Sequence, residues 1–146
     1  LGQDNLSVTP LNIGLALAAL ANNGSVPQPQ LALAISDQEG NWQEQPLEKE
    51  PIQVVSGAVG NAVLDALRGQ NGLSEISTRV ISGPDNSINA WYVGLSTSLA
   101  TDYVVIVIIE GTNQESDART VGRGVISAVH ELQSGSANGE TEPNSS

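Results

Sequence analysis

The first apolar segment of the chain predicts a helix with a clear start and a clear end. Thr9 can cap its N-terminus, and Pro10 fits the first turn, where the missing amide donor costs nothing. Gly24 follows Asn22 and Asn23 and closes the segment, as glycine commonly does at helix C-termini. Nearly every residue between these marks is Leu, Ile or Ala, so we expect a core helix that is buried on all sides.

The next segment combines extended and helical patterns. Leu31–Ile35 and a strand around Trp42 flank a turn at residues 37–40, which predicts a small β-hairpin. Gln43–Pro51 is polar and contains prolines, which indicates a surface loop. Apolar residues then recur at helical spacing over Val55–Leu67, so a second helix is expected there.

The last third of the chain predicts a hairpin, a third strand and a helix. Ile76–Ile81 and Ile88–Leu95 flank the turn Gly83–Ser87, which is rich in turn-forming residues. After Tyr103, the segment Tyr103–Ile109 contains only Val and Ile. This pattern is typical of a strand covered on both faces and paired on both edges. A helix of about Ala118–Leu132 follows.

These elements predict an α+β fold, in which an antiparallel sheet of three C-terminal strands plus the small hairpin packs with helices. The length of 146 residues suits one domain, which we place at residues 1–133. Residues 134–146 are mostly Ser, Gly, Asn and Glu and are expected to form a disordered polar tail.

The composition limits which residues can fill the core and which classes of partner the chain can bind. The chain has no Phe, Met or Cys, so Leu, Ile, Val and Ala must fill most of the interior. Its net charge of −11 would repel phosphate groups, which argues against a nucleic-acid partner and against an anionic membrane surface. The absence of Cys excludes thiolate nucleophiles and Cys-based metal sites. Leu1 opens the chain without an initiator Met or a signal sequence, which suggests a fragment or a processed chain.

Several segments follow the order of a known family. Residues 8–11 read Val-Thr-Pro-Leu and run into residues 18–24, which read Ala-Ala-Leu-Ala-Asn-Asn-Gly. A proline-bracketed hairpin, a helix rich in Ala and Val, and a strand–turn–strand follow, and residues 90–94 read Ala-Trp-Tyr-Val-Gly. With the strand Val104–Glu110 and the last helix, these features resemble the C-terminal part of a penicillin-binding protein transpeptidase domain over about residues 1–132.

The resemblance implies an extracytoplasmic protein of the bacterial cell envelope, related to serine D,D-transpeptidases that cross-link peptidoglycan. Family members acylate an active-site Ser, the same Ser that β-lactams acylate. They use the motifs Ser-x-x-Lys, Ser-x-Asn and Lys-Thr-Gly, the last on the strand that precedes the Ala-Trp-Phe-Val-Gly strand. A nearby base makes the hydroxyl nucleophilic, and the Lys of Lys-Thr-Gly positions the substrate carboxylate.

The chain departs from each of these motifs. Its only lysine is Lys49, with Pro46 three residues before it, so the chain contains no Ser-x-x-Lys. No Ser-x-Asn stands ahead of the first helix. We assign the Lys-Thr-Gly position to Ile81, Ser82 and Gly83, and an Ile cannot hold a carboxylate. We therefore assign no catalytic residue and expect a pseudoenzyme, at least for this chain alone.

The resemblance also implies an open sheet edge. In the family's five-stranded sheet, two N-terminal strands lie beside the closing strand, and this chain has no counterpart of them. Tyr103–Ile109 would then expose an edge of Val and Ile, which promotes aggregation unless it is covered. We expect this edge to pair with a second copy of the chain or with an N-terminal fragment of the same protein.

Two groups of polar residues imitate functional sites. His130 is the only His, and without a Gly-x-Ser-x-Gly motif we interpret it as structural; a triad would need Ser127 or a distant Ser. Asp37, Glu39, Asn41 and Glu48 imitate a calcium loop, but Trp42 occupies the position that needs Gly, so a hairpin turn is the better interpretation. We predict no metal site and no cofactor.

Glycines and aromatic residues of the second half also have two interpretations. Gly122-Arg123-Gly124 lacks the third Gly of a dinucleotide motif and more readily permits close packing of a helix against the sheet. Trp91 and Tyr92 point to opposite faces of a strand, so we expect at most one of them in the core. An exposed Trp91 could contact a ligand, although ordinary packing is favoured.

Three functions follow from these observations. The first is a non-catalytic penicillin-binding-protein-like module that binds peptidoglycan or acts as a scaffold. The second is an enzyme fragment whose Ser lies on upstream sequence and completes a D,D-transpeptidase site. The third is an assembly domain that uses the edge of Tyr103–Ile109 for strand addition.

Overall fold

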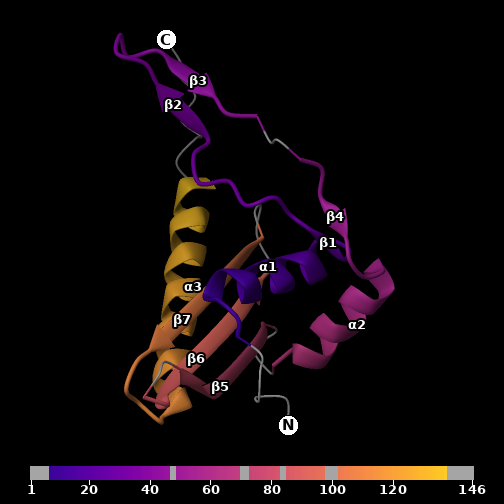
Figure 1. The fold of residues 1–146 in the computed structure, drawn as a ribbon, viewed down its shortest axis with the longest axis vertical. Helices are drawn as coiled ribbons and strands as arrows, with labels where there is room; N and C mark the ends of the chain where they lie inside the picture. The colour runs from indigo at the N-terminus through magenta and orange to yellow at the C-terminus, as the bar shows by residue number, and fades with distance from the viewer. Residues whose placement is uncertain (1–6, 47–48, 70–72, 83–84, 98–101, 138–146) are drawn as a thin grey trace, which may run out of the picture. The chain divides into compact units, whose positions relative to one another are not determined.

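A computed structural model describes residues 7–46, 49–69, 73–82, 85–97 and 102–137 (Figure 1). It confirms the predicted α+β class, since antiparallel strands and helices alternate along the chain. The chain divides into two compact units, Leu1–Val63 and Leu64–Ser146. The first holds a helix and four short strands, and the second holds a three-stranded sheet with a long helix; helix α2, Gly57–Leu67, spans the boundary.

Helix α1, Pro10–Ala21, begins and ends as predicted. The Thr9 hydroxyl accepts a hydrogen bond from the Asn12 amide at 3.2 Å, which satisfies a free donor of the first turn. Asn23 and Gly24 have positive φ and reverse the chain after the helix. The prediction of burial on all sides was wrong: only Leu17 and Ala19 of α1 are buried, and Leu11 is 59% exposed. Within the first unit α1 contacts β1, and the Leu20 carbonyl lies close to Gly60 of α2.

Strands β1, Ser25–Val26, and β4, Ile52–Gln53, form a small antiparallel pair after this helix. The carbonyl oxygen of Gly24 accepts hydrogen bonds from the amides of Val54 and Val55. A side chain at Gly24 would overlap the Val55 carbonyl, so this close approach requires glycine.

The predicted hairpin is present as strands β2, Ala34–Ser36, and β3, Trp42–Glu44. They are antiparallel, and Ala34 lies opposite Glu44. Asp37 holds the turn: its carboxylate accepts hydrogen bonds from the amides of Glu39 and Asn41, both at 2.9 Å. This local bonding makes Asp and Asn effective turn residues, and it confirms the hairpin interpretation of these acidic residues.

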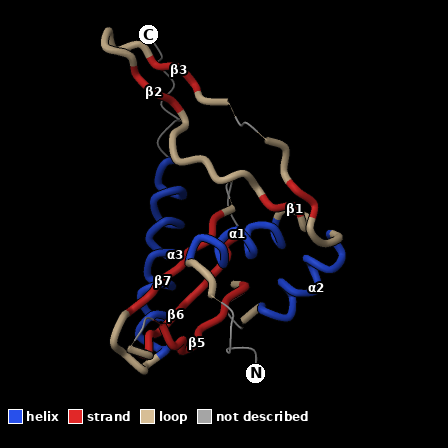
Figure 2. The backbone as a smooth tube through the Cα atoms, viewed as in Figure 1, coloured by secondary structure: helices blue, strands red, loops and turns tan. Residues whose placement is uncertain are grey.

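The second unit contains an antiparallel sheet in the order β5-β6-β7, with bounds Ser74–Ser82, Ser87–Ser96 and Tyr103–Ile109 (Figure 2). All three strands were predicted, and β7 has the predicted limits. The prediction that β7 is paired on both edges was not met, because β6 is its only partner among the described residues.

Helix α3, Glu115–Ala137, is longer than predicted at both ends. The predicted domain boundary at residue 133 therefore falls inside this helix, whereas 138–146 of the expected tail lie outside the described residues. Helix α3 packs along one face of the sheet, mainly over β6 and β7. Its contact face includes Ala118 and Ile126, which form a buried cluster with Ala90 and Tyr92 of β6.

The central strand β6 is buried on both faces. Tyr92 is fully buried towards α3, while Trp91, on the opposite face, is only 9% exposed. The expectation that at most one of these two aromatic residues belongs to the core was therefore wrong. Val93 and Leu95, which share the face of Trp91, are buried as well, so burial of that whole face overrides the usual alternation of buried and exposed residues.

Candidate functional site

The residues assigned to the Lys-Thr-Gly position lie at the end of β5. Ile81 and Ser82 are paired with Ile88 and Ser87 of β6, beside the turn that joins the two strands. Ile81 is 54% exposed, and Gly83 lies outside the described residues. No lysine occupies any position of β5, since Lys49 is the only lysine of the chain. The absence of a lysine on this strand is therefore independent of how the motif is aligned.

Strand β5 forms one border of the sheet. On its outer side, Ser74 makes an isolated bridge with Arg68, and the Leu73 carbonyl accepts a hydrogen bond from the Gly69 amide at 2.8 Å. Because outward and inward bonding alternate along a strand, the amides of Ser77, Arg79 and Ile81 also point outward. From Glu75 onward, the described part of the chain contains no strand that pairs with this side of β5. Over the described residues, the outer side of β5 therefore has no strand partner from Glu75 onward.

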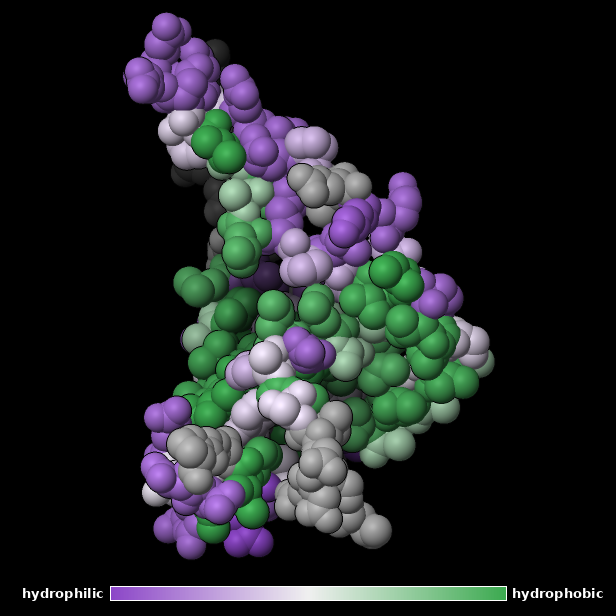
Figure 3. All heavy atoms as spheres, in the orientation of Figure 1, coloured by the Kyte–Doolittle hydropathy of each residue, from purple (hydrophilic) through white to green (hydrophobic). Residues whose placement is uncertain are grey.

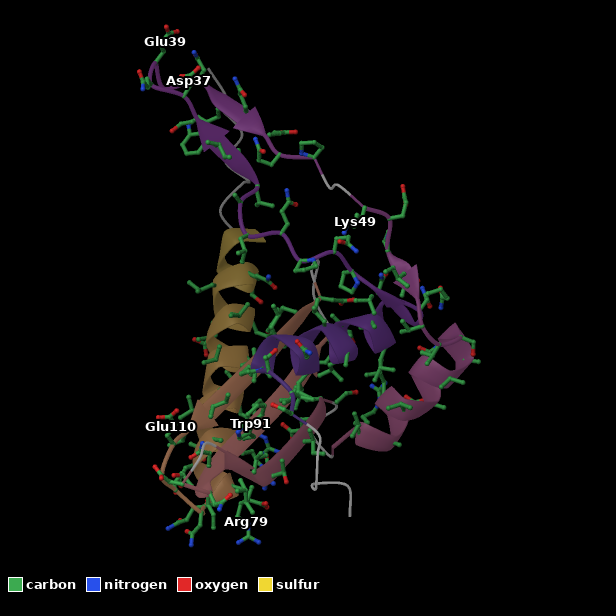
Figure 4. The ribbon with its side chains drawn as sticks, viewed as in Figure 1. Asp37, Glu39, Lys49, Arg79, Trp91 and Glu110 are labelled. Carbon is green, nitrogen blue, oxygen red and sulfur yellow. The ribbon has the colours of Figure 1, made fainter. Side chains whose placement is uncertain are left out.

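Trp91 lies on β6, the strand next to β5, opposite Thr78 (Figure 4). Its indole Nε1 is buried, and none of the described residues accepts a hydrogen bond from it. The burial of this side chain agrees with the packing role that we favoured, and a ligand contact at Trp91 stays a prediction.

A charged network on the other face of the sheet joins β5 to α3. Glu75 accepts hydrogen bonds from the Tyr92 hydroxyl at 2.9 Å and from Arg123 Nε at 3.1 Å, and its second oxygen contacts the Arg123 guanidinium as well. The hydrogen bond from Arg123 lowers the pKa of Glu75, although burial acts in the opposite direction. Burial and the neighbouring carboxylate raise the pKa of Tyr92. The network fixes the helix to the sheet by charge-assisted bonds.

Two glycines make room for this network. Gly122 of α3 lies directly over the Tyr92 ring, so that a Cβ atom at this position would overlap ring carbons. Gly94, two residues along β6 from Tyr92, would likewise overlap its phenol ring and hydroxyl. The predicted packing role of Gly122-Arg123-Gly124 is thus confirmed for Gly122, whereas Gly124 has open space around it.

His130 pairs with a distant serine. The Oγ atom of Ser96, at the end of β6, lies 2.7 Å from Nε2 of His130, and the Tyr103 ring makes an edge contact with the imidazole. A hydroxyl beside an imidazole is the geometry of a serine nucleophile and its base. Ser96 is only 1% exposed, however, so a substrate carbonyl could not reach it in this arrangement. The pair joins β6 to α3, which fits a structural role.

Ser96 and Glu75 were not singled out from the sequence. The only signal for either is the alternation of β5 and β6, which places Glu75, Tyr92 and Ser96 on the face that α3 covers. The register of the hairpin and the rotation of α3 decide which polar groups meet, and neither is readable from the pattern of apolar residues.

Metal-binding geometry is not found in the part of the chain that the structure describes, where no three His, Asp or Glu residues cluster suitably. Of the residues that imitate a calcium loop, Asp37 uses its carboxylate for the hairpin turn, and its bonds to Asn41 lower its pKa. Glu48 lies outside the described residues. No helix over the described ranges is long and apolar enough to cross a membrane.

Comparison with known proteins identifies the family. The penicillin binding protein transpeptidase domain matches residues 1–128. The fold is similar to the crystal structure of a peptidoglycan synthetase from Bifidobacterium adolescentis, with a TM-score of 0.65 and 17% sequence identity. That match covers 94% of this chain and 29% of the synthetase, so the chain spans less than a third of its structural neighbour. No curated protein sequence matches the chain. Together with the order of helix, hairpin and sheet, the domain match shows that the chain belongs to the penicillin-binding protein transpeptidase family.

Proposed function

We propose that this chain is a non-catalytic transpeptidase-like module of peptidoglycan synthesis in the bacterial cell envelope, where it binds or scaffolds rather than cross-links. The observation that carries the proposal is the composition of β5, which has no lysine along Ser74–Ser82. Without an ammonium group on this strand, the substrate carboxylate is not held as the family's chemistry requires.

The outer side of β5 supports a binding role. An extended peptide can add to a sheet edge through main-chain hydrogen bonds, while nearby side chains select among peptides. Arg79 is the only cation on β5, and it is exposed. Its guanidinium can pair with a peptide carboxylate, which suits the acidic stem peptides of peptidoglycan. We therefore expect reversible binding of a stem peptide along this side of β5.

Two assays test this proposal. Incubation with a fluorescent penicillin should leave no covalent label on the chain, and a synthetic stem peptide should bind reversibly in a calorimetric titration. Ile81→Pro removes an outward amide of β5 and should weaken that binding, whereas Ile81→Ser keeps the amide and should bind as the unchanged chain does. Covalent labelling by penicillin, or the absence of any peptide binding, would contradict the proposal.

The second candidate is an enzyme fragment that completes a D,D-transpeptidase site with further sequence. The family match favours it, because the matched domain is described as a transpeptidase domain. If it is correct, penicillin labels the complex of this chain with the upstream part, and the label resides on a Ser of that part.

The third candidate is assembly through β7. This strand ends the described sheet, and all seven of its residues are only half-buried, although six of them are Val or Ile. Such an edge favours strand addition by a second copy or by an N-terminal fragment. Sedimentation should then show a dimer, and amides of 104–108 should be protected from exchange. A monomer with rapid exchange along these amides would count against a second copy.

A further inference from the structure

The hairpin of β2 and β3 forms an arm, which we define as residues 30–45. Within the first unit, neither strand packs against another described element. The tip of the arm is hydrophilic and apolar side chains lie nearer its base (Figure 3). Its large apolar residues are highly exposed: Leu31 at 104%, Leu33 at 75%, Ile35 at 54% and Trp42 at 73%. Exposed apolar residues that gather on one small element indicate a surface for a partner.

The register assigns these residues to two faces. Ile35 lies opposite Gln43, and the Leu33 carbonyl accepts a hydrogen bond from the Gln45 amide at 2.8 Å. Because side chains alternate along a strand, Leu33 and Ile35 share one face of the arm. Trp42 lies opposite Ser36, and Glu44 lies opposite Ala34, so these two side chains share the other face. The arm thus has an aliphatic face and a face that carries an aromatic ring and a carboxylate.

Among the described residues, no strand pairs with the outer edge of β2. Leu33 and Asp37 bond inward, to Gln45 and Asn41, so the amides of Ala34 and Ser36 point away from β3. A two-stranded hairpin is only marginally stable, and a third strand with an apolar face is needed for independent stability. The Asp37 turn already holds the hairpin in place, which reduces the entropy lost when a third strand binds.

The charge of the arm limits which kind of partner it can bind. The arm contains Asp37, Glu39 and Glu44 and no basic residue, and Asp37 and Glu39 lie at its tip (Figure 4). No Lys, Arg or His precedes Lys49 in the sequence. A second copy of the arm would bring like charges together, and the same charges repel an anionic membrane. A basic partner is attracted instead.

We propose that the arm binds an extended segment of a partner protein in which apolar residues alternate with Lys or Arg. The segment adds as a third strand to the outer edge of β2. Its apolar side chains then lie beside Leu33 and Ile35, and its basic side chains lie on the opposite face, towards Glu44 and the ring of Trp42. This site is separate from the proposed peptide site on β5 and does not depend on it.

The test uses two synthetic peptides of equal composition and charge, one that alternates Val with Lys and one that carries the same residues in two blocks. Binding of each labelled peptide to the whole chain is measured by fluorescence anisotropy. Both peptides feel the net charge of −11, so charge alone predicts equal affinity. Strand addition predicts that the alternating peptide binds at least about tenfold more tightly.

Matched variants locate the binding to the arm. Leu33→Ser with Ile35→Ser should abolish the preference, whereas Leu132→Ser, at a 72% exposed position of α3, should keep it. Ala34→Pro removes an outward amide and should also abolish it, whereas Ala34→Ser keeps that amide and the preference. Circular dichroism of each variant checks that the chain remains folded.

Four outcomes would overturn the inference. The two peptides could bind with equal affinity, or the preference could survive Ala34→Pro. Sedimentation could instead show a dimer that Leu33→Ser with Ile35→Ser dissociates, which would assign the arm to a second copy. Binding to phosphatidylcholine vesicles that depends on Leu33 and Ile35, without a preference between peptides, would assign the arm to a membrane surface.

Discussion

Two regions of this molecule, the sheet covered by α3 and the arm of residues 30–45, differ most in how far their side chains are buried. In the second unit, Tyr92 is fully buried, its ring lies against Gly122, and its hydroxyl bonds to Glu75. In the arm, Leu33 and Trp42 are mostly exposed, and one carboxylate, that of Asp37, organises the turn. Each region contains an antiparallel hairpin, β5-β6 in the sheet and β2-β3 in the arm.

The difference between them lies in what covers their side chains. The sheet has a helix across one face, so each substitution there meets packed neighbours and changes the free energy of unfolding. The arm has no such cover in its own unit, so its apolar residues contribute little to the stability of the isolated chain. Regions of the first kind determine the fold, and regions of the second kind are suited to binding partners.

The largest effect is expected at Gly122. In Gly122→Ala the added methyl group overlaps the Tyr92 ring, which must move or displace α3, and we expect a loss of about 2–3 kcal/mol in the free energy of unfolding. Gly124→Ala is the matched control, because nothing lies within 4 Å of its added methyl. That variant should gain about 0.5–1 kcal/mol from its higher helix propensity.

Urea unfolding followed by Trp91 fluorescence measures both variants. A Trp42→Phe background removes the signal of the arm, so that the remaining tryptophan reports the second unit alone. Equal stabilities of the Gly122 and Gly124 variants would show that α3 does not lie as closely on Tyr92 as the structure has it.

The next effect concerns Glu75, whose side chain is only 9% exposed and bonds to Arg123 and Tyr92. Glu75→Gln should cost about 1–2 kcal/mol at neutral pH, a value reduced by the half-exposed guanidinium of Arg123. Because folding lowers the pKa of this carboxyl, its contribution is complete above the unfolded pKa of about 4.3 and disappears as the pH falls through the lower folded pKa.

Unfolding free energies between neutral pH and about pH 3 measure this dependence, since that range crosses the ordinary pKa of Glu. The difference in unfolding free energy between the unchanged chain and Glu75→Gln should begin to shrink below about pH 4.3 and approach zero only as the pH falls through the lowered folded pKa. If the two curves stay parallel down to that pH, the ion pair with Arg123 does not stabilise the fold through ionisation of Glu75.

A smaller effect is expected at Ser96. Ser96→Ala removes the hydroxyl that lies 2.7 Å from His130 Nε2 and should cost about 1 kcal/mol. Ser127→Ala, on an exposed position of α3, should leave stability almost unchanged. The nitrogen chemical shifts of the His130 ring should respond to the first variant and not to the second. A response to Ser127→Ala alone would assign the His130 partner to that serine.

These contrasts also separate what the sequence predicts from what it does not. Helix α1 and strand β7 follow local rules, because Thr9, Pro10 and Gly24 mark the helix ends and an unbroken run of Val and Ile marks the strand. The burial of α1 depends on which neighbours reach it, and the local pattern does not show those neighbours. Leu11 was expected to be buried, but it is exposed. The same dependence made the prediction for Trp91 and Tyr92 fail.

The candidate site divides in the same way. The absence of a lysine on β5 can be read directly from the sequence, once the strand before Trp91 is located. The meeting of Glu75 with Arg123 cannot, because the residues are 48 apart and their contact depends on how α3 lies across the sheet. Long-range polar contacts depend on how the elements pack, and local residue patterns predict the elements but not their packing.

The smallest effect is expected on the arm, and it tests the comparison most directly. Leu33→Ser with Ile35→Ser replaces two large apolar residues, a change that in a packed core would cost several kcal/mol. Because Leu33 is 75% exposed and Ile35 is 54% exposed, we expect a change of less than about 0.5 kcal/mol per substitution in the free energy of unfolding. Thermal unfolding followed by circular dichroism, with Leu17→Ser of the buried face of α1 as the control, measures both. A large loss of stability in the arm variant would mean that the arm already has a cover within the chain, and it would remove the reason to seek a partner for it.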